Sequence, residues 1–220
     1  MEIDFNSLIE NFLKGELKKK TIGVYYPSEI GSCLRKTFYS YNYPRETNAE
    51  LMKFFQTGIF IHDFVVDVIK SEKNPDVELL VSESPFKFEV DDFIISGRID
   101  DIVLLKINGV VYLLEIKSTG NLYYVNEPSL GHIYQTQVYM HHAGIRNGVI
   151  LYIEKNTLKT RWFNVDYDAK TADLVIHRFR ELHNYLTRNE LPVAEAQVTK
   201  ELNWQCKNCD YREECSTNKL

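Results

Sequence analysis

The sequence predicts an α/β fold in which helices flank a mixed β-sheet. Three observations lead to this prediction: helical periodicity near both ends, three successive strand-like segments in the middle, and a helix that follows them and precedes two further strands. A strand–helix–strand step inside an otherwise antiparallel run requires a right-handed crossover and therefore a parallel pair of strands. The chain shows no internal repeat, and we expect residues 1–220 to form a single domain.

Helical periodicity marks five segments. Residues 5–20 place Phe5 and Leu8 on one side of an amphipathic helix. Pro27-Ser28-Glu29 resembles an N-cap, and we expect it to open a helix that carries Cys33. The remaining helices are expected over residues 48–71, 129–144 and 168–188, followed by a loop from Pro192 towards the C-terminal cysteines.

Strand periodicity begins after Asn74-Pro75. Asn108-Gly109 lies between two apolar runs, which is the pattern of a two-residue hairpin turn. Such a turn makes Ile107 face Val110 and fixes the register of the two strands that it joins. The five strands are expected over residues 77–90, 93–106, 110–118, 148–154 and 159–165.

This hairpin register predicts a cluster of charged groups. Asp100 faces Lys117, and Glu115 is its diagonal neighbour at about 7–8 Å or less. Because side chains alternate along a strand, these three groups project from one face of the sheet and Asp101 from the other. Two carboxylates on a mostly apolar hairpin are costly unless they are paired or bind a metal. A plain salt bridge is the alternative, but Asp100 and Lys117 alone would suffice for it.

The cluster has the equipment for phosphodiester hydrolysis. Carboxylate oxygens suit Mg²⁺ or Mn²⁺, and such an ion polarises a phosphoryl oxygen and lowers the pKa of bound water. Lys117 beside the ion would neutralise charge on the scissile phosphate. Gly97, close before Asp100, indicates a bulge or a close backbone approach, and a plain irregularity at a strand bend is the alternative.

Two helices supply candidate partners for this cluster. His62 lies in the apolar stripe of the helix over 48–71, where a core histidine is the alternative to a metal ligand. Gln135 and Tyr139 lie four residues apart and therefore share a face of the next helix, with His132 on the same side. Ordinary polar facing of an amphipathic helix is the alternative for these three residues.

Four cysteines occur, one near the start and three near the end of the chain. Two disulfides are one interpretation, but we expect a reducing compartment because no secretory signal is visible at the N-terminus. Buried inert thiols fit poorly, since the surroundings of the last three are polar. A metal or cluster site is favoured, and the spacing does not choose between zinc and iron–sulfur. The ligands would be Cys33, Cys206, Cys209 and Cys215.

Composition excludes two classes of protein. The chain has 44% hydrophobic and 26% charged residues, which is ordinary for a globular protein. Its net charge of −5 excludes non-specific polycation binding, so any nucleic-acid site must be a local groove. No apolar run approaches the length of about 18 residues that a membrane span needs. We therefore expect a cytoplasmic protein without a membrane segment.

Several side chains are candidates for contacts with a nucleic acid. Aromatic residues make up 13% of the chain, and four tyrosines fall in predicted loops where bases can stack, although ordinary packing is the more frequent role. These are Tyr25, Tyr26, Tyr123 and Tyr124, and the candidate phosphate contacts are Arg35, Lys36 and Arg98.

Taken in order, these motifs resemble the PD-(D/E)xK nucleases of the RecB type. The match consists of Gly-Arg-Ile-Asp at 97–100, Glu-Ile-Lys at 115–117 and Gln135-x-x-x-Tyr139. With His62 and the four cysteines, the set resembles the CRISPR-associated RecB-like exonucleases that carry an iron–sulfur cluster and are similar to the nuclease domain of AddB. The resemblance covers residues 25–216.

The resemblance implies a restriction-endonuclease-like core and a small iron–sulfur region formed by residues 21–45 and 200–220. It implies a [4Fe–4S] cluster on the four cysteines, and Lys117, Gln135 and Tyr139 as active-site residues beside the metal. Two departures stand out: the first acidic motif is a double Asp, and Leu34 follows Cys33 where relatives often have proline. The implied ligands of Mn²⁺ or Mg²⁺ are His62, Asp100, Glu115 and the backbone carbonyl of Ile116.

Relatives of this kind degrade single-stranded DNA, often from the 5′ end, and some cut internally. They process spacer precursors alongside CRISPR integrase proteins, which are therefore the implied partners. Two alternatives stay open: a viral or stand-alone recombination and repair nuclease, and a scaffold that binds DNA or integrase proteins without cutting. The intact set of Asp100, Glu115 and Lys117 speaks against the scaffold.

Overall fold

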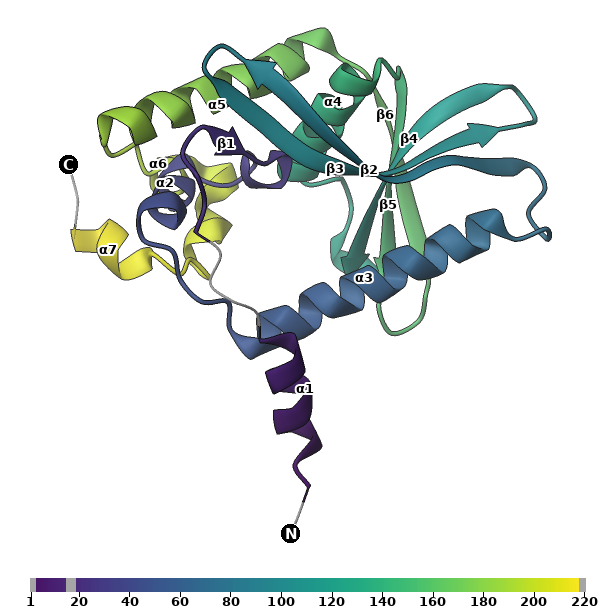
Figure 1. Cartoon of the computed structure of the whole chain (residues 1–220), viewed down its shortest axis with the longest axis horizontal. Coiled ribbons are helices and arrows are strands. Elements are labelled where there is room, and N and C mark those ends of the chain that lie inside the picture. The colour runs from purple at the N-terminus through teal and green to yellow at the C-terminus, as the bar shows by residue number, and fades with distance from the viewer. Residues whose placement is uncertain (1–2, 15–18, 218–220) are drawn as a thin grey trace.

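The fold is built on a mixed β-sheet (Figure 1), seen in a computed structural model that describes residues 3–14 and 19–217. The strand order is β1-β3-β4-β5-β6, and β2 pairs antiparallel with β3 from Phe93 to Leu105, along its other edge. β4 and β5 are parallel and joined through a helix, which confirms the predicted crossover. The strands are β1 (Val24–Tyr25), β2 (Val77–Val90), β3 (Phe93–Leu105), β4 (Val110–Thr119), β5 (Asn147–Glu154) and β6 (Thr160–Asp166).

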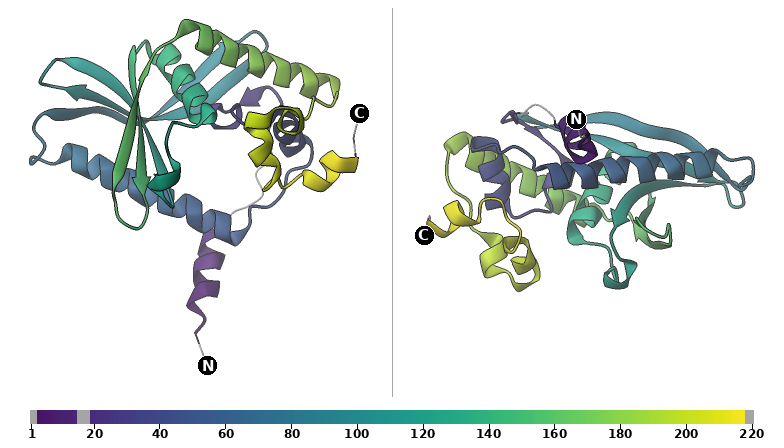
Figure 2. Two further views of the ribbon diagram at one scale, coloured as in Figure 1. Left: turned by 180° about the vertical axis from the view of Figure 1, so that it is seen from behind. Right: turned by 90° about the horizontal axis from the view of Figure 1, so that it is seen from below.

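Helices cover both faces of the sheet (Figure 2). α3 (Ala49–Lys70) lies on one face and forms a small apolar cluster with Leu114 and Ile116 of β4. α4 (Leu130–Ala143) and α5 (Ala169–Arg188) cover the other face and form the main core, with Phe179 fully buried at its centre. The α/β class with a helix-flanked mixed sheet is therefore confirmed.

The three long helices begin at side-chain caps close to the predicted starts. Asn48, Ser129 and Asp168 each accept hydrogen bonds from backbone N–H groups of the first turn, which would otherwise lack partners. The helix predicted over residues 5–20 is too long, because α1 (Phe5–Leu13) ends before Lys14, whose backbone is extended. Residues 15–18 of that prediction lie outside the described residues.

The segment around Cys33 differs from the prediction. Pro27–Glu29 forms only a short 3₁₀ turn, η1, and Cys33 is the N-cap of a separate helix, α2 (Leu34–Asn42). Gly31 between them lies so close to Gly131 of α4 that a Cβ on Gly31 would be 2.1 Å from the Cα of Gly131. This backbone approach holds the segment against α4 and separates the two elements.

Two regions contain secondary structure that was not predicted from the sequence. The two-residue strand β1 pairs parallel with β3, where the sequence predicts a loop. The predicted loop after Pro192 contains three short elements: α6 (Glu195–Val198), η3 (Lys200–Cys206) and α7 (Arg212–Thr217). Segments this short have too few residues for a periodic signal, so tertiary contacts decide their conformation.

The hairpin between β3 and β4 has a longer turn than predicted. Leu105, not Ile107, faces Val110, so residues 106–109 form the turn. The register therefore shifts by two residues, and an even shift leaves every side chain on its predicted face. Continued by one step, this register places Asp100 directly opposite Glu115 rather than opposite Lys117.

No helix in the described ranges is long and apolar enough to cross a membrane. Gly97 pairs regularly with Phe86 and no bulge is present at this position, but side chains crowd it: a Cβ there would lie 2.7 Å from the ring of Phe86 and 3.2 Å from the side chain of Pro27. The glycine thus allows β3 to pass under η1 on the way to Asp100.

Candidate active site

The candidate site lies where β3 and β4 separate, which we call the fork. The two strands pair from Leu105–Val110 to Asp101–Leu114, and beyond this point β4 continues beside β5 alone. Figure 1 shows β2 and β3 turning away from the ends of β4 and β5. In the gap, Oδ2 of Asp100 accepts a hydrogen bond from the backbone N–H of Ile116 at 2.9 Å. A side chain thus replaces a ladder hydrogen bond at the fork.

A chain of four side chains runs from the fork towards α4. Glu115 has no exposed surface, and its Oε1 lies 2.6 Å from Nζ of Lys117. Lys117 Nζ donates to Oε1 of Gln135 at 3.1 Å, and Gln135 Nε2 donates to the hydroxyl of Tyr139 at 3.1 Å. The structure therefore brings Gln135 and Tyr139, which the sequence placed on one helix face, onto Lys117.

Burial shifts the proton equilibria of this chain. Desolvation raises the pKa of Glu115 to about 7, although Lys117 opposes the shift. Desolvation also raises the pKa of Asp100, again against Lys117. Burial alone would lower the pKa of Lys117, but Glu115 and Asp100 hold it above its ordinary value. The lysine stays charged, whereas ionisation of the two carboxylates has a desolvation cost in free energy that an additional cation would reduce.

His62 approaches the fork from the opposite face of the sheet. Its Nε2 lies 3.3 Å from Oδ2 of Asp101. This contact raises the pKa of His62, and burial opposes the rise with a smaller effect. Asp101 does project away from the α4 face, as the alternation predicts, but this is the face that α3 covers with His62. The sequence analysis gave the metal role to Asp100 and none to Asp101. The adjacent pair Asp100-Asp101 in the sequence could have indicated a second buried carboxylate.

The residues at the fork fit a divalent cation by their chemistry. At the fork, five buried polar atoms of the described residues make no hydrogen bond of ordinary geometry: Nε2 of His62, both carboxylate oxygens of Asp101 and both of Glu115. Three of them have an ion-pair contact instead, Oε1 of Glu115 with Lys117 and Nε2 of His62 with Oδ2 of Asp101. Buried polar atoms of this kind are rare unless they bind something, and carboxylate oxygens with an imidazole suit Mn²⁺. In residues 3–14 and 19–217 no three His, Cys, Asp or Glu side chains already stand in the geometry of a metal site.

Tyr152 and His132 complete the α4 side of the site. Tyr152 pairs with Lys117 across the parallel β4–β5 register, and its hydroxyl lies 2.7 Å from Nδ1 of His132. Burial and the nearby Lys117 lower the pKa of His132 to about 3, so the imidazole is neutral. The sequence analysis did not identify Tyr152 as a site residue. Its position in the predicted strand over 148–154 puts its side chain on the same face of the sheet as that of Lys117.

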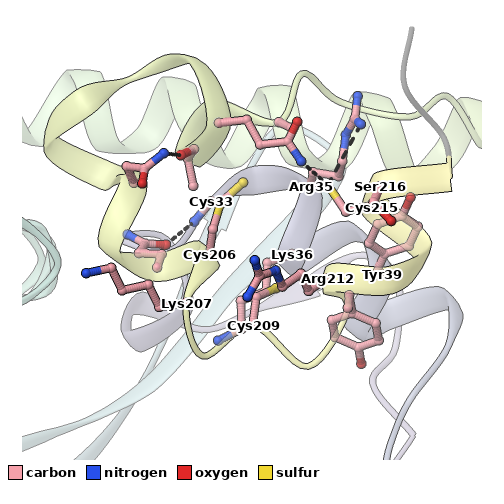
Figure 3. A pocket seen from close by; sticks show the side chains of 16 residues that line it. Cys33, Arg35, Lys36, Tyr39, Cys206, Lys207, Cys209, Arg212, Cys215 and Ser216 are labelled. Atoms are coloured by element: carbon pink, nitrogen blue, oxygen red, sulfur yellow. Dashed lines mark hydrogen bonds between the residues drawn. The ribbon is translucent and has the colours of Figure 1, made fainter.

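The four cysteines lie at a second site, where the start of α2 meets the C-terminal elements (Figure 3). They line a cavity of about 440 Å³ between α2, η3 and α7, and all four are free thiols. Burial first, and then the other three cysteines, raise the pKa of Cys206, as expected for thiols close together. The cavity also has cationic side chains in its wall, namely Arg35, Lys36, Lys207 and Arg212.

Hydrogen bonds from the C-terminal region hold Cys33 in place. The backbone N–H of Cys33 donates to Oε1 of Gln205 at 2.8 Å, and Nε2 of the same Gln205 donates to the carbonyl of Gly31 at 3.2 Å. The next N–H, of Leu34, donates to Glu195, which also pairs with Arg178 at 2.7 Å. The start of α2 is therefore capped by residues from the other end of the chain.

Two sequence-based candidates for DNA contact are wrong. Arg35 is buried, and its Nε donates to the carbonyl of Pro192, so it is not available to a phosphate. Tyr25 is fully buried in the core, where it lies edge-on to Phe93 and bonds His183. In contrast, Tyr123 and Tyr124 are both 78% exposed.

A profile of the PD-(D/E)XK nuclease superfamily matches residues 60–216. The chain belongs to this superfamily. The matched segment includes the fork, α4 and the three C-terminal cysteines. This confirms the superfamily that the motifs resemble, whereas the CRISPR-associated branch stays a prediction. No curated protein sequence matches the chain.

Three solved structures share the fold. SSO0001 has a TM-score of 0.62 at 19% identity, with 94% of each chain covered. An alkaline exonuclease from Laribacter hongkongensis has a TM-score of 0.55 at 12% identity, covering 77% of this chain and 90% of its own. A phage-related exonuclease from Haemophilus somnus has a TM-score of 0.52 at 12% identity, covering 82% and 97%. At these identities the likeness concerns the fold.

Proposed function

We propose that this protein is a metal-dependent DNA exonuclease whose active site is the fork. The observation that carries the proposal is the buried Glu115 joined to Lys117 and Gln135, beside further carboxylate oxygens that make no hydrogen bond. Such a set is expensive to keep in a core and is explained by a cation that binds there. Two similar folds belong to exonucleases, which supports the same reaction here.

The proposed ligands of Mn²⁺ or Mg²⁺ are Glu115, Asp100, His62 and the backbone carbonyl of Ile116. Asp101 is a second candidate for the first acidic position, because its carboxylate meets His62. When bound, the ion would polarise the scissile phosphate and lower the pKa of the attacking water.

The chain's own residues act around that ion. Lys117 offers a charge for the phosphate oxygens, and the Gln135 amide fixes the direction of its ammonium group. Tyr139, buried behind Gln135, accepts from the amide and so holds the orientation of Gln135. Because this order is present without substrate, little reorganisation is needed at the moment of reaction.

We further propose a [4Fe–4S] cluster on Cys33, Cys206, Cys209 and Cys215. Four thiolates on one zinc ion would converge with Zn–S distances of about 2.3 Å. All four thiols line one cavity, and the choice of iron–sulfur over zinc rests on the motif resemblance. In this role the cluster is structural and joins the start of α2 to the C-terminal region.

The proposed substrate is single-stranded DNA, degraded from the 5′ end, in CRISPR adaptation together with integrase proteins. The motif resemblance and the four cysteines support this context. A recombination or repair nuclease of phage or stand-alone type is the second candidate, supported by the fold shared with a phage-related exonuclease. A non-cleaving scaffold is disfavoured by the complete Glu115–Lys117–Gln135 chain.

The test is an anaerobic digestion of end-labelled single strands with Mn²⁺, using cluster-loaded protein. We expect wild-type protein to shorten the strands, and Glu115→Gln to be at least about 10³-fold slower, a barrier increase of about 4 kcal/mol. Labels at the 5′ and 3′ ends separate the two polarities. Intact DNA with wild-type protein that retains its iron would refute the nuclease and favour the scaffold.

A further inference from the structure

Two adjacent tyrosines stand out on the surface beside the fork. Tyr123 and Tyr124, in the 3₁₀ turn η2 (Leu122–Tyr124), are each 78% exposed, and their rings lie 5.3 Å apart and nearly perpendicular. Neither hydroxyl makes a hydrogen bond within the described residues. The surface carries other exposed aromatic side chains, and Tyr123 and Tyr124 differ from these in forming an adjacent pair with their rings in contact.

The turn that carries the rings is held firmly. The side chain of Asn121 accepts the backbone N–H of Tyr123 at 2.8 Å, and Glu154 at the end of β5 accepts that of Leu122 at 3.1 Å. Leu122 and Val125 on either side pack against the main core. The rings are therefore presented outward by a fixed backbone and cannot fold into the core.

The position of η2 relative to the fork is set by the sheet. Lys117 and Thr119 lie on β4 just before η2, and the chain then returns to α4, which carries Gln135. In parallel strands such as β4 and β5, ligands bind outside the carboxyl ends of the strands. The two tyrosines follow this carboxyl edge directly, four and five residues after Thr119 at the end of β4.

A cationic and aromatic neighbour lies at the same edge. Lys155, directly after β5, donates its backbone N–H to Thr119 at 2.9 Å. Its ammonium lies 4.7 Å from the ring centre of Phe54, a half-exposed residue of α3. The edge therefore combines aromatic faces with a charge for the phosphate backbone, which is the composition of single-strand sites.

We propose that Tyr123 and Tyr124 form a stacking platform for unpaired bases of the DNA strand held at the fork. Because the rings are nearly perpendicular, each offers its face to a different base. Bases in a duplex are already stacked on their neighbours, so the platform accepts a single strand and rejects a duplex. The inference rests on the proposed function, since it names the contacts that give that site its single-strand specificity.

The test compares removal of the rings with removal of the bases. Fluorescence anisotropy in EDTA measures the affinity of cluster-loaded protein for an oligothymidine and for an abasic strand of equal length. We expect wild-type protein to bind the abasic strand at least about tenfold more weakly, as loss of base stacking predicts. A Tyr123→Leu/Tyr124→Leu variant should bind oligothymidine about tenfold more weakly and the abasic strand as wild type does.

Trp162→Leu on the edge strand β6 is the matched control, since Trp162 is a comparably exposed aromatic side chain, 63% exposed, outside η2. It should keep the wild-type preference for bases, and all three proteins should melt at similar temperatures because the substituted rings are exposed. Equal sensitivity to base removal in the double variant and in wild type would overturn the platform, as would wild-type protein that binds both strands equally.

The assay without metal also separates the two proposals. If wild-type protein prefers strands with bases but cleaves nothing when Mn²⁺ is added, the exonuclease proposal fails and the platform stands. If cleavage occurs at the same rate for wild type and the double variant, with equal KM and equal affinity, the platform fails and the exonuclease stands.

Discussion

The fork and the cysteine region differ in how far apart in the sequence their members lie. At the fork, Asp100, Glu115 and Lys117 come from two strands joined by one short turn, and strand alternation alone puts them on one face. In the cysteine region, Cys33 meets Cys206 and Cys209 from the other end of the chain. The first site is fixed by local geometry, and the second needs the whole fold to close.

This difference predicts how a substitution at each site affects catalysis and stability. A carboxylate at the fork sits on a strand whose pairing persists without it, so substitution there should affect chemistry more than folding. The cysteine region is held by hydrogen bonds such as Cys33 to Gln205, together with any group that binds the thiols. Substitution there should affect stability more than the chemical step.

The largest expected effect is at the fork and decides between its two aspartates. Asp100→Asn should lower kcat/KM for single-stranded DNA by about 10³-fold, or about 4 kcal/mol, because it removes a proposed metal ligand. Asp101→Asn should cost less than about tenfold. Steady-state kinetics with Mn²⁺ measure both. A larger loss for Asp101→Asn would transfer the ligand role to the carboxylate that meets His62.

The next effect concerns the cysteine region. Cys33→Ser should lower the melting temperature by at least about 6 °C, from a loss of about 3 kcal/mol, because it removes a ligand that joins the two chain ends. Calorimetry and iron analysis measure the effect. Ser216→Ala, in the wall of the same cavity, is the control and should change little. An unchanged melting temperature for Cys33→Ser would contradict the clamp.

A smaller effect tests the hydrogen bonds around that clamp. Gln205→Ala leaves the buried N–H of Cys33 without its partner and should cost about 1–3 kcal/mol of unfolding free energy. Gln205→Glu keeps the acceptor for Cys33 but loses the donor to Gly31, so its cost should be intermediate. Chemical denaturation of the loaded protein measures both. Equal stability of wild type and Gln205→Ala would show that the cysteines close this region unaided.

The smallest effect returns to the fork and concerns pH. The pKa of His132 is lowered to about 3 in the fold, so the unfolded chain takes up a proton first as the pH falls. The stabilisation is complete above the ordinary histidine pKa of about 6.5 and is lost at up to about 1.4 kcal/mol per pH unit below it. Compared with wild type, His132→Gln should lose less stability between pH 6.5 and 5. Parallel curves would contradict a buried neutral imidazole.

The prediction of the hairpin shows how far local patterns reach. Asn108-Gly109 predicted a two-residue turn, whereas the turn in the structure consists of the four residues 106–109. The facing of Asp100 and Glu115 nevertheless agrees with the prediction, because only an odd register shift exchanges the faces. The contact between His62 and Asp101 could not be predicted, since it depends on which face of the sheet α3 covers.

The sequence by itself determined the order of the main helices and strands, the parallel β4–β5 pair and the faces of the charged residues, because these follow from periodicity and chain connectivity. Only the tertiary structure decided where β3 leaves β4, the burial of Arg35 and Tyr25, and the exposure of Tyr123 and Tyr124. It also decided the short elements that bring Cys206 to Cys33. Such features depend on contacts between distant segments, which no local window of sequence contains.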